Sequence, residues 1–223
     1  MFASEAVRLR KILLATGEVS PLLNLGSSTR AFREVEKPHI EAELFAPLRT
    51  ARIEVVHSDL KLADGIDVAG DILDPQVQAS LAARGFRCVL LSNLLEHVAD
   101  RNAVAQACEA IAGPGGLVLA TVPSSYPYHA DPIDTGYRPA PEALSALFSN
   151  SDPVFAEEVD GSTYREQLRQ RGETTAGALM RTVLWILAAP LRPKSARARL
   201  SRWRWYNRPY RVSIALVRVR NSS

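Results

Sequence analysis

A short stretch after residue 125 concentrates side chains that could carry acid–base chemistry. His129 is the candidate general base, because the pKa of a free imidazole lies near neutrality. Asp131 or Asp134 could orient its ring. A pocket for the molecule that gives up the proton could be formed by Tyr126, Tyr128, Tyr137 and Arg138. The alternative is a proline-stiffened loop whose aromatic rings pack on the protein and whose Asp-Pro pairs form turns.

Two acidic residues and a loop of small residues could together bind a nucleoside. Asp59 and Asp71 each follow a predicted strand. A carboxylate in that position can accept hydrogen bonds from both hydroxyls of a ribose. The loop Gly26-Ser27-Ser28-Thr29 opens a predicted helix, where glycine lets a ligand approach the backbone and the following residues offer hydroxyl and N–H groups. Each feature alone could be a helix cap or a turn, but together they favour a ligand site.

The elements that must position these residues follow from the apolar runs. Continuous rather than alternating hydrophobicity predicts strands covered on both faces, as in parallel sheets. Asp100 is the predicted N-cap of a helix that continues through Ala112. Strands are expected over residues 19–25, 53–58, 66–70, 86–92, 116–122, 154–160 and 210–220. The pattern predicts a doubly wound α/β sheet, in which ligands bind at the carboxyl ends of the strands.

One segment resembles a known family. Leu94-Leu95-Glu96-His97-Val98, then the predicted helix, then Pro114-Gly115-Gly116 with a further proline at Pro123, resembles the second half of class I S-adenosylmethionine-dependent methyltransferases of the type 11 kind. The resemblance covers about residues 20–160 and the final strand. It implies a Rossmann-like, mostly parallel sheet of seven strands with the last one antiparallel. It also implies a single domain over residues 1–223, with a helical insertion over residues 162–209.

The resemblance further implies S-adenosylmethionine as cofactor and assigns residues to it. Asp59 would hold the ribose, and Asp71 with Ile72 would flank the adenine. Glu96 and His97 would lie one turn beyond the cofactor, with His97 as a second catalytic candidate. The full expected cofactor set is Asn24, Gly26, Ser27, Ser28, Asp59, Asp71, Ile72, Asn93 and Leu94.

The first motif departs from the pattern of that family. Asn24, Ser28 and Arg30 stand where the family carries an acidic residue and two further glycines, so that only Gly26 is retained. The alternative to an enzyme is therefore a non-catalytic module that kept the sheet and binds a membrane surface or a partner through its basic end. A nicotinamide oxidoreductase is a weaker possibility, because it would require the full glycine fingerprint, which this sequence lacks.

Charge is distributed unevenly along the chain. Residues 1–161 hold 13 Lys/Arg and 22 Asp/Glu, whereas residues 162–223 hold 14 and 2. The apolar stretch over residues 176–191 is too short and too interrupted to span a bilayer, and Arg residues interleaved with Trp203, Trp205 and Tyr206 follow it. This composition suits a lid or subunit contact, an anionic membrane surface or, as the least favoured reading, nucleic acid.

Composition limits the remaining classes. With 223 residues, 47% of them hydrophobic and 23% charged, the chain is typical of one globular core. Cys88 and Cys108 stand in apolar contexts, which indicates core residues in a reducing compartment. The four histidines lack metal-ligand spacing. The N-terminal run of basic and apolar residues lacks a signal-peptide cleavage pattern, so we expect a cytoplasmic protein, with peripheral attachment to the inner face of the membrane as an option. The expected acceptor is a small molecule or a lipid-linked or saccharide intermediate.

Overall fold

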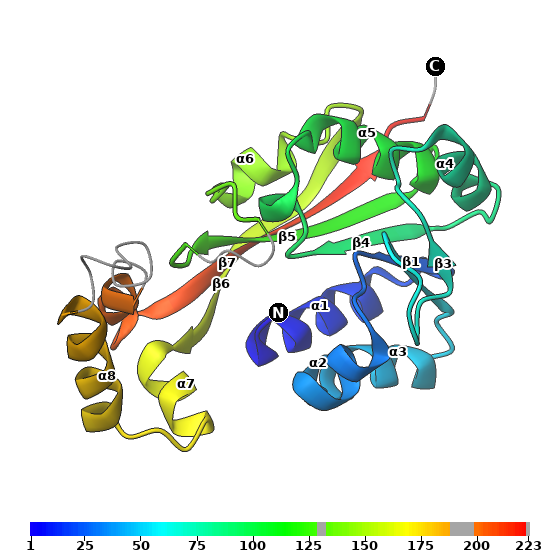
Figure 1. Cartoon of the computed structure of the whole chain (residues 1–223). Helices are drawn as coiled ribbons and strands as arrows, with labels where there is room; N and C mark the ends of the chain where they lie inside the picture. Colours follow the sequence, from blue (N-terminus) through cyan, green and yellow to red (C-terminus); the bar gives the residue numbers. More distant parts are fainter. Residues whose placement is uncertain (129–132, 188–198, 222–223) are drawn as a thin grey trace.

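The computed structural model describes residues 1–128, 133–187 and 199–221, and its centre is a seven-stranded sheet (Figure 1). The strand order is β3-β2-β1-β4-β5-β7-β6. The first five strands in that order are parallel, and β7 runs antiparallel to both β5 and β6. The strands are β1 (Leu22–Leu25), β2 (Val55–Asp59), β3 (Val68–Ala69), β4 (Cys88–Ser92), β5 (Leu117–Ser125), β6 (Ser151–Thr163) and β7 (Pro209–Val219). The predicted fold class is confirmed.

Helices cover both faces of this sheet. In Figure 1, α1 to α3 lie on one face and α4 to α6 on the other. The helices are α1 (Ala3–Thr16), α2 (Pro38–Ile40), α3 (Ala46–Thr50), α4 (Pro75–Ala82), α5 (Arg101–Ala112), α6 (Pro141–Ser145), α7 (Tyr164–Gln170) and α8 (Thr175–Leu187). Short π-helical turns flank α2, and 3-10 turns occupy Leu95–His97 and Trp203–Trp205. Because β1, β4 and the first part of β5 are buried on both faces, their sequences are continuously apolar rather than alternating.

Of the helices α5 and α1, only α5 was predicted from the sequence. The predicted helix after Asp100 is confirmed, since the Ala103 N–H donates to Asp100 Oδ1 at 2.9 Å and the helix ends at Gly113. The helix α1 was not predicted. Its buried residues Ala6, Leu9 and Leu13 recur at helical spacing, so it packs as an amphipathic helix on the sheet.

The last two strands extend beyond the rest of the sheet. Ser125 at the end of β5 lies opposite Arg211, while Thr163 of β6 lies opposite Pro209 at the start of β7. The helices α7 and α8 stand at this end of the two strands (Figure 1). The described parts of the segment 162–209 therefore lie near the carboxyl end of β5, where a doubly wound fold binds its ligands. None of the helices that the structure describes is long and apolar enough to cross a membrane.

Candidate functional site

The loop after β1 makes a sharp turn that requires glycine. Gly26 has φ +68°, a conformation that side chains with a Cβ rarely adopt. A Cβ at this position would also stand 3.0 Å from Leu94 Cδ1, at the end of the neighbouring strand β4. Gly26 and Leu94, both predicted to face the cofactor, therefore lie side by side at the carboxyl edge of the sheet.

Asp59 lies at the end of β2 and joins this loop to a hollow. Its Oδ2 accepts from the Ser28 N–H at 2.8 Å, and its Oδ1 accepts from the Leu60 N–H at 2.8 Å. Each carboxylate oxygen can accept a further hydrogen bond, so a pair of hydroxyls can be bound in addition. The hollow measures about 300 Å³ and is lined by Ser28, Thr29, Asp59, Lys61, Leu62, Ala63 and Ile66. The predicted pairing of the Ser28 loop with Asp59 is thus found around a single cavity.

A buried arginine that the sequence analysis missed holds the loop from behind. Arg33 Nη1 donates to the carbonyl oxygens of Ser27 at 3.1 Å and Ser28 at 2.5 Å, and Nη2 donates to that of Gly65 at 2.9 Å. Burial lowers the pKa of Arg33. The guanidinium fixes both walls of the hollow, because Gly65 precedes the lining residue Ile66. The sequence signal was a lone arginine four residues after the loop, which is too common to be specific.

Asn24 is directed toward the next strand. Its Nδ2 lies 3.0 Å from Nδ1 of His57 on β2, and Asn24 is buried. Burial lowers the pKa of His57 to about 4, so its imidazole is neutral at physiological pH and can accept this hydrogen bond. Asn24 and the buried Ser27 do not line the hollow, and their contact with a cofactor stays a prediction.

The predicted adenine contacts lie after β3. Asp71 Oδ1 accepts from the Leu73 N–H at 2.9 Å, which forms a local turn, and Asp71 is exposed. Ile72 is buried in the hydrophobic core with Leu25 and Val56. Neither Asp71 nor Ile72 lines the hollow, so the structure leaves their role toward adenine as a prediction.

A buried carboxylate, Glu5 of α1, organises the carboxyl ends of β4 and β5. Its Oε1 accepts from Thr121 Oγ1 at 2.6 Å and from Asn93 Nδ2 at 2.8 Å, and its Oε2 accepts from the Phe2 N–H at 3.0 Å. The Asn93 side chain, which was expected to face the cofactor, is thus bound to α1. The sequence analysis missed Glu5, although it lies four residues before Leu9 on the apolar side of the helix, where a carboxylate is unusual.

Glu96 is a second fully buried carboxylate, close enough to Glu5 for the two charges to interact. Among the described residues neither of its carboxylate oxygens has a hydrogen-bond partner, and the imidazole Nε2 of His97 stands 3.8 Å from Oε1. Burial raises the pKa of Glu96 to about 7, and Glu5 adds to the rise while His97 and Arg138 oppose it. A carboxyl group that titrates near neutrality at the ligand edge of the sheet is suited to take up a proton or to pair with a cation.

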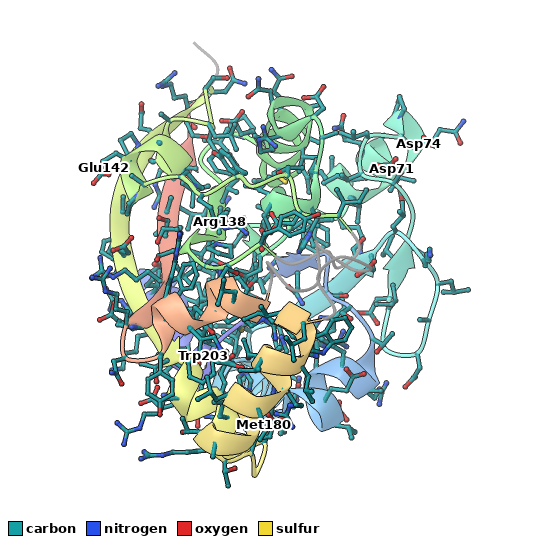
Figure 2. The ribbon with its side chains drawn as sticks, turned by 60° about the vertical axis from the view of Figure 1, so that its left-hand side comes forward. Asp71, Asp74, Arg138, Glu142, Met180 and Trp203 are labelled. Carbon is teal, nitrogen blue, oxygen red and sulfur yellow. The ribbon has the colours of Figure 1, made fainter. Side chains whose placement is uncertain are left out.

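Residues 133–138 of the loop after β5 lie against the Glu96–His97 turn. The Thr135 N–H donates to the Glu96 carbonyl at 2.9 Å, and His97 Nδ1 lies 2.5 Å from the Ile133 carbonyl. Arg138 Nη2 donates to the buried carboxylate of Asp134 at 2.6 Å. The loop is therefore braced by an internal ion pair (Arg138 is labelled in Figure 2). His129 and Asp131 lie outside the described residues, so their predicted roles remain predictions.

The tyrosines of this loop differ in environment. Tyr126 is packed with its ring centroid 4.8 Å from that of Tyr210. Tyr137 is half-buried beneath the Arg101 guanidinium, 4.5 Å from its ring centroid. Tyr128 is exposed. Tyr126 and Tyr137 pack as the alternative interpretation expected, and an acceptor contact stays a prediction for all three. No group of three or more His, Cys, Asp or Glu suited to a metal ion occurs within the described parts of the chain.

The fold is that of class I S-adenosylmethionine-dependent methyltransferases. An S-adenosylmethionine-dependent methyltransferase from Archaeoglobus fulgidus has a TM-score of 0.51 at 13% identity, over 96% of this chain and 92% of that one. The N-methyltransferase NodS from Bradyrhizobium japonicum, in complex with S-adenosylhomocysteine, has a TM-score of 0.50 at 14% identity, over 98% and 86%. No protein-family model matches the sequence, and no curated protein matches it.

Proposed function

We propose that this chain is an S-adenosylmethionine-dependent methyltransferase that binds its cofactor in the hollow beside Asp59. The observation that carries the proposal is the position of the Asp59 carboxylate. It ends β2, faces the loop after β1 and lines a cavity of about 300 Å³, at the lower end of the volumes of small-molecule sites. In support, the fold is that of methyltransferases, and NodS was solved with S-adenosylhomocysteine.

The lining residues fit such a cofactor. Asp59 would accept from the ribose hydroxyls, and Leu62 and Ile66 offer apolar contact to an adenine ring. Gly26 would let the cofactor approach the backbone at the end of β1. Bound S-adenosylmethionine supplies an electrophilic methyl group on sulfur. The protein then has to align a nucleophile with that group and, for some acceptors, remove a proton.

Two side chains are candidates for that proton. Glu96 titrates near neutrality and lies at the carboxyl edge of β4, and His129 stays the candidate from the loop after β5. The acceptor is unidentified, and a small molecule or a lipid-linked or saccharide intermediate remains the proposal.

Cofactor binding should depend on Asp59. Isothermal titration with S-adenosylmethionine is expected to show binding that weakens by about tenfold or more in Asp59→Asn, because the amide retains only one acceptor oxygen. Asp152→Asn on β6 is the matched control, since that exposed acid pairs with Arg220 far from the hollow. The proposal is wrong if the wild-type protein gives no heat of binding, and the site is misplaced if Asp59→Asn binds as tightly as the control.

A separate prediction concerns His129. If it is the general base, His129→Ala should lose about a hundredfold or more of turnover and keep its affinity for the cofactor. Turnover would be followed with labelled S-adenosylmethionine on an acceptor found by screening amines, phenols and saccharides. Unchanged turnover in His129→Ala would remove this residue as the base.

A further inference from the structure

The helix α8 turns most of its apolar side chains toward solvent. Of its 13 residues, only Ala178 and Thr182 are buried. Six large apolar side chains are 43% to 72% exposed: Leu179, Met180, Val183, Leu184, Ile186 and Leu187. We call these six residues the α8 face (Met180 is labelled in Figure 2). An apolar patch gathered on one exposed helix usually marks an interaction site.

The side of α8 opposite to the α8 face is bound to the rest of the protein. These contacts fix the orientation of the helix, with the α8 face directed outward. Trp203 Nε1 donates to Thr182 Oγ1 at 3.0 Å, and Tyr206 Oη lies 2.9 Å from Thr175 Oγ1. The Trp203 ring also meets the Tyr164 ring of α7 edge to face at 5.6 Å. The polar and aromatic side of α8 thus binds the protein, and its apolar side is left uncovered.

The charge around the α8 face is mostly positive, although Arg181 of α8 pairs with Glu173. Glu173 is the last acidic residue of the chain, and residues 174–223 hold 11 Lys/Arg. Arg204 and Arg208, which follow α8 in sequence, are exposed. Arg199 stacks on the Trp185 ring of α8 at 5.1 Å. Apolar side chains beside exposed cations and aromatic rings complement the interface of a bilayer with anionic headgroups.

Other occupants fit this combination less well. Two copies joined through their α8 faces would bring two sets of exposed cations, among them Arg204 and Arg208, close together, and like charges repel. Nucleic acid would bind the cations and leave the apolar side chains in water. Over its described residues α8 is 13 residues long, which as a helix spans about 20 Å, less than the thickness of a hydrocarbon core of about 30 Å.

We propose that the α8 face docks on the surface of an anionic lipid bilayer, with the helix lying in the plane of the interface. The 3-10 turn Trp203–Trp205, which binds α8 through Trp203, also contacts the carboxyl edge of the sheet. Trp205 Nε1 donates to Ser125 Oγ at the end of β5 at 3.0 Å. Docking would therefore hold that edge near the headgroups. This consequence, which rests on the proposed function, favours a lipid-linked acceptor among those considered.

Vesicle co-sedimentation of the full chain tests the proposal. The protein is expected to bind phosphatidylcholine vesicles that contain phosphatidylglycerol, and to bind less as salt screens the charges. Met180→Glu with Leu184→Glu should weaken binding by about tenfold or more. The matched control is Leu14→Glu with Val35→Glu, two apolar positions on the N-terminal helical layer that are 43% and 76% exposed. The control adds the same charge and should bind as the wild type does.

Three results would overturn the proposal: no binding to the anionic vesicles at low salt, equal binding to pure phosphatidylcholine, or equal binding by the α8 variant and the control. Sedimentation velocity supplies a fourth, since a dimer that dissociates in the α8 variant would show that a second copy covers the face. Titration with S-adenosylmethionine is run on the same proteins without vesicles. It fails if the proposed function is wrong, independently of whether the protein binds lipid.

Discussion

Glu5→Ala is expected to lower the free energy of unfolding by about 3–5 kcal/mol, the largest loss that we predict for a single substitution. The reason is the set of donors that the carboxylate satisfies. Thr121 Oγ1, Asn93 Nδ2 and the Phe2 N–H all donate to it, and Glu5 itself is fully buried. Alanine would leave these donors unpaired in a closed environment, and each pays the cost of desolvation. Denaturant unfolding at pH 7 measures the change.

Two further variants separate this effect from a loss of charge. Glu5→Gln keeps one acceptor oxygen for Thr121 and Asn93, so we expect a smaller loss than for alanine. Glu18→Ala removes an acid whose side chain is 82% exposed, just beyond the same helix, and should change stability by less than about 0.5 kcal/mol. If Glu5→Ala is as stable as Glu18→Ala, the carboxylate does not organise the ends of β4 and β5.

The sheet could be predicted because its signal is local. Strands buried on both faces are continuously apolar in sequence, and this is visible for β4 and β5 without knowledge of their neighbours. The cap of α5 is local as well, since Asp100 accepts from a residue three positions later. The carboxyl edge follows from the topology, which is why Gly26 and Asp59 were correctly expected on one side of the sheet.

The polar contacts of the site could not be predicted, because they join residues far apart in sequence. Glu5 and Thr121 are separated by 116 positions, and Asn93 is bound to the same carboxylate. Asn24 shows the same limit: its partner His57 belongs to the next strand, and only the register of β1 with β2 brings the two together. A family pattern predicts the position of such a residue in a strand, but it does not predict which neighbouring residue the side chain contacts.

The role of the buried Glu96 carboxyl group can be tested by measuring both the stability and the activity of a variant. Its pKa is raised from 4.5 to about 7, so the folded protein resists its ionisation. Below pH 4.5 the contribution of neutral Glu96 to the free energy of unfolding is fully present. It is lost as the pH rises through 7, and the whole loss amounts to about 3 kcal/mol. Glu96→Gln removes the charge and keeps the shape. We expect the variant to match the wild type near pH 4 and to be more stable by up to about 3 kcal/mol at pH 8.

The pH dependence of stability has to be compared between the wild type and Glu96→Gln, because the titration of His57 changes stability in the opposite direction. The pKa of His57 is lowered from 6.5 to about 4, so its contribution is complete above pH 6.5 and is lost as the pH falls toward 4. In the wild type the two contributions oppose each other across the same pH range. In Glu96→Gln only that of His57 remains, so the variant should lose stability on acidification more steeply than the wild type does. Parallel curves for the two proteins would show that Glu96 is not held neutral by burial.

The ionised carboxylate of Glu96 lowers the stability of the protein at neutral pH, and a role in catalysis would explain why this position carries a carboxylate. If Glu96 receives the proton of the acceptor, Glu96→Gln should lose about a hundredfold or more of turnover while its affinity for S-adenosylmethionine is unchanged. The variant would then be more stable and less active, as expected when a group that lowers stability serves catalysis. A variant that is more stable and fully active would exclude Glu96 as proton acceptor and leave His129 as the candidate. The same acceptor assay on His129→Ala then decides between a carboxylate and an imidazole as the base.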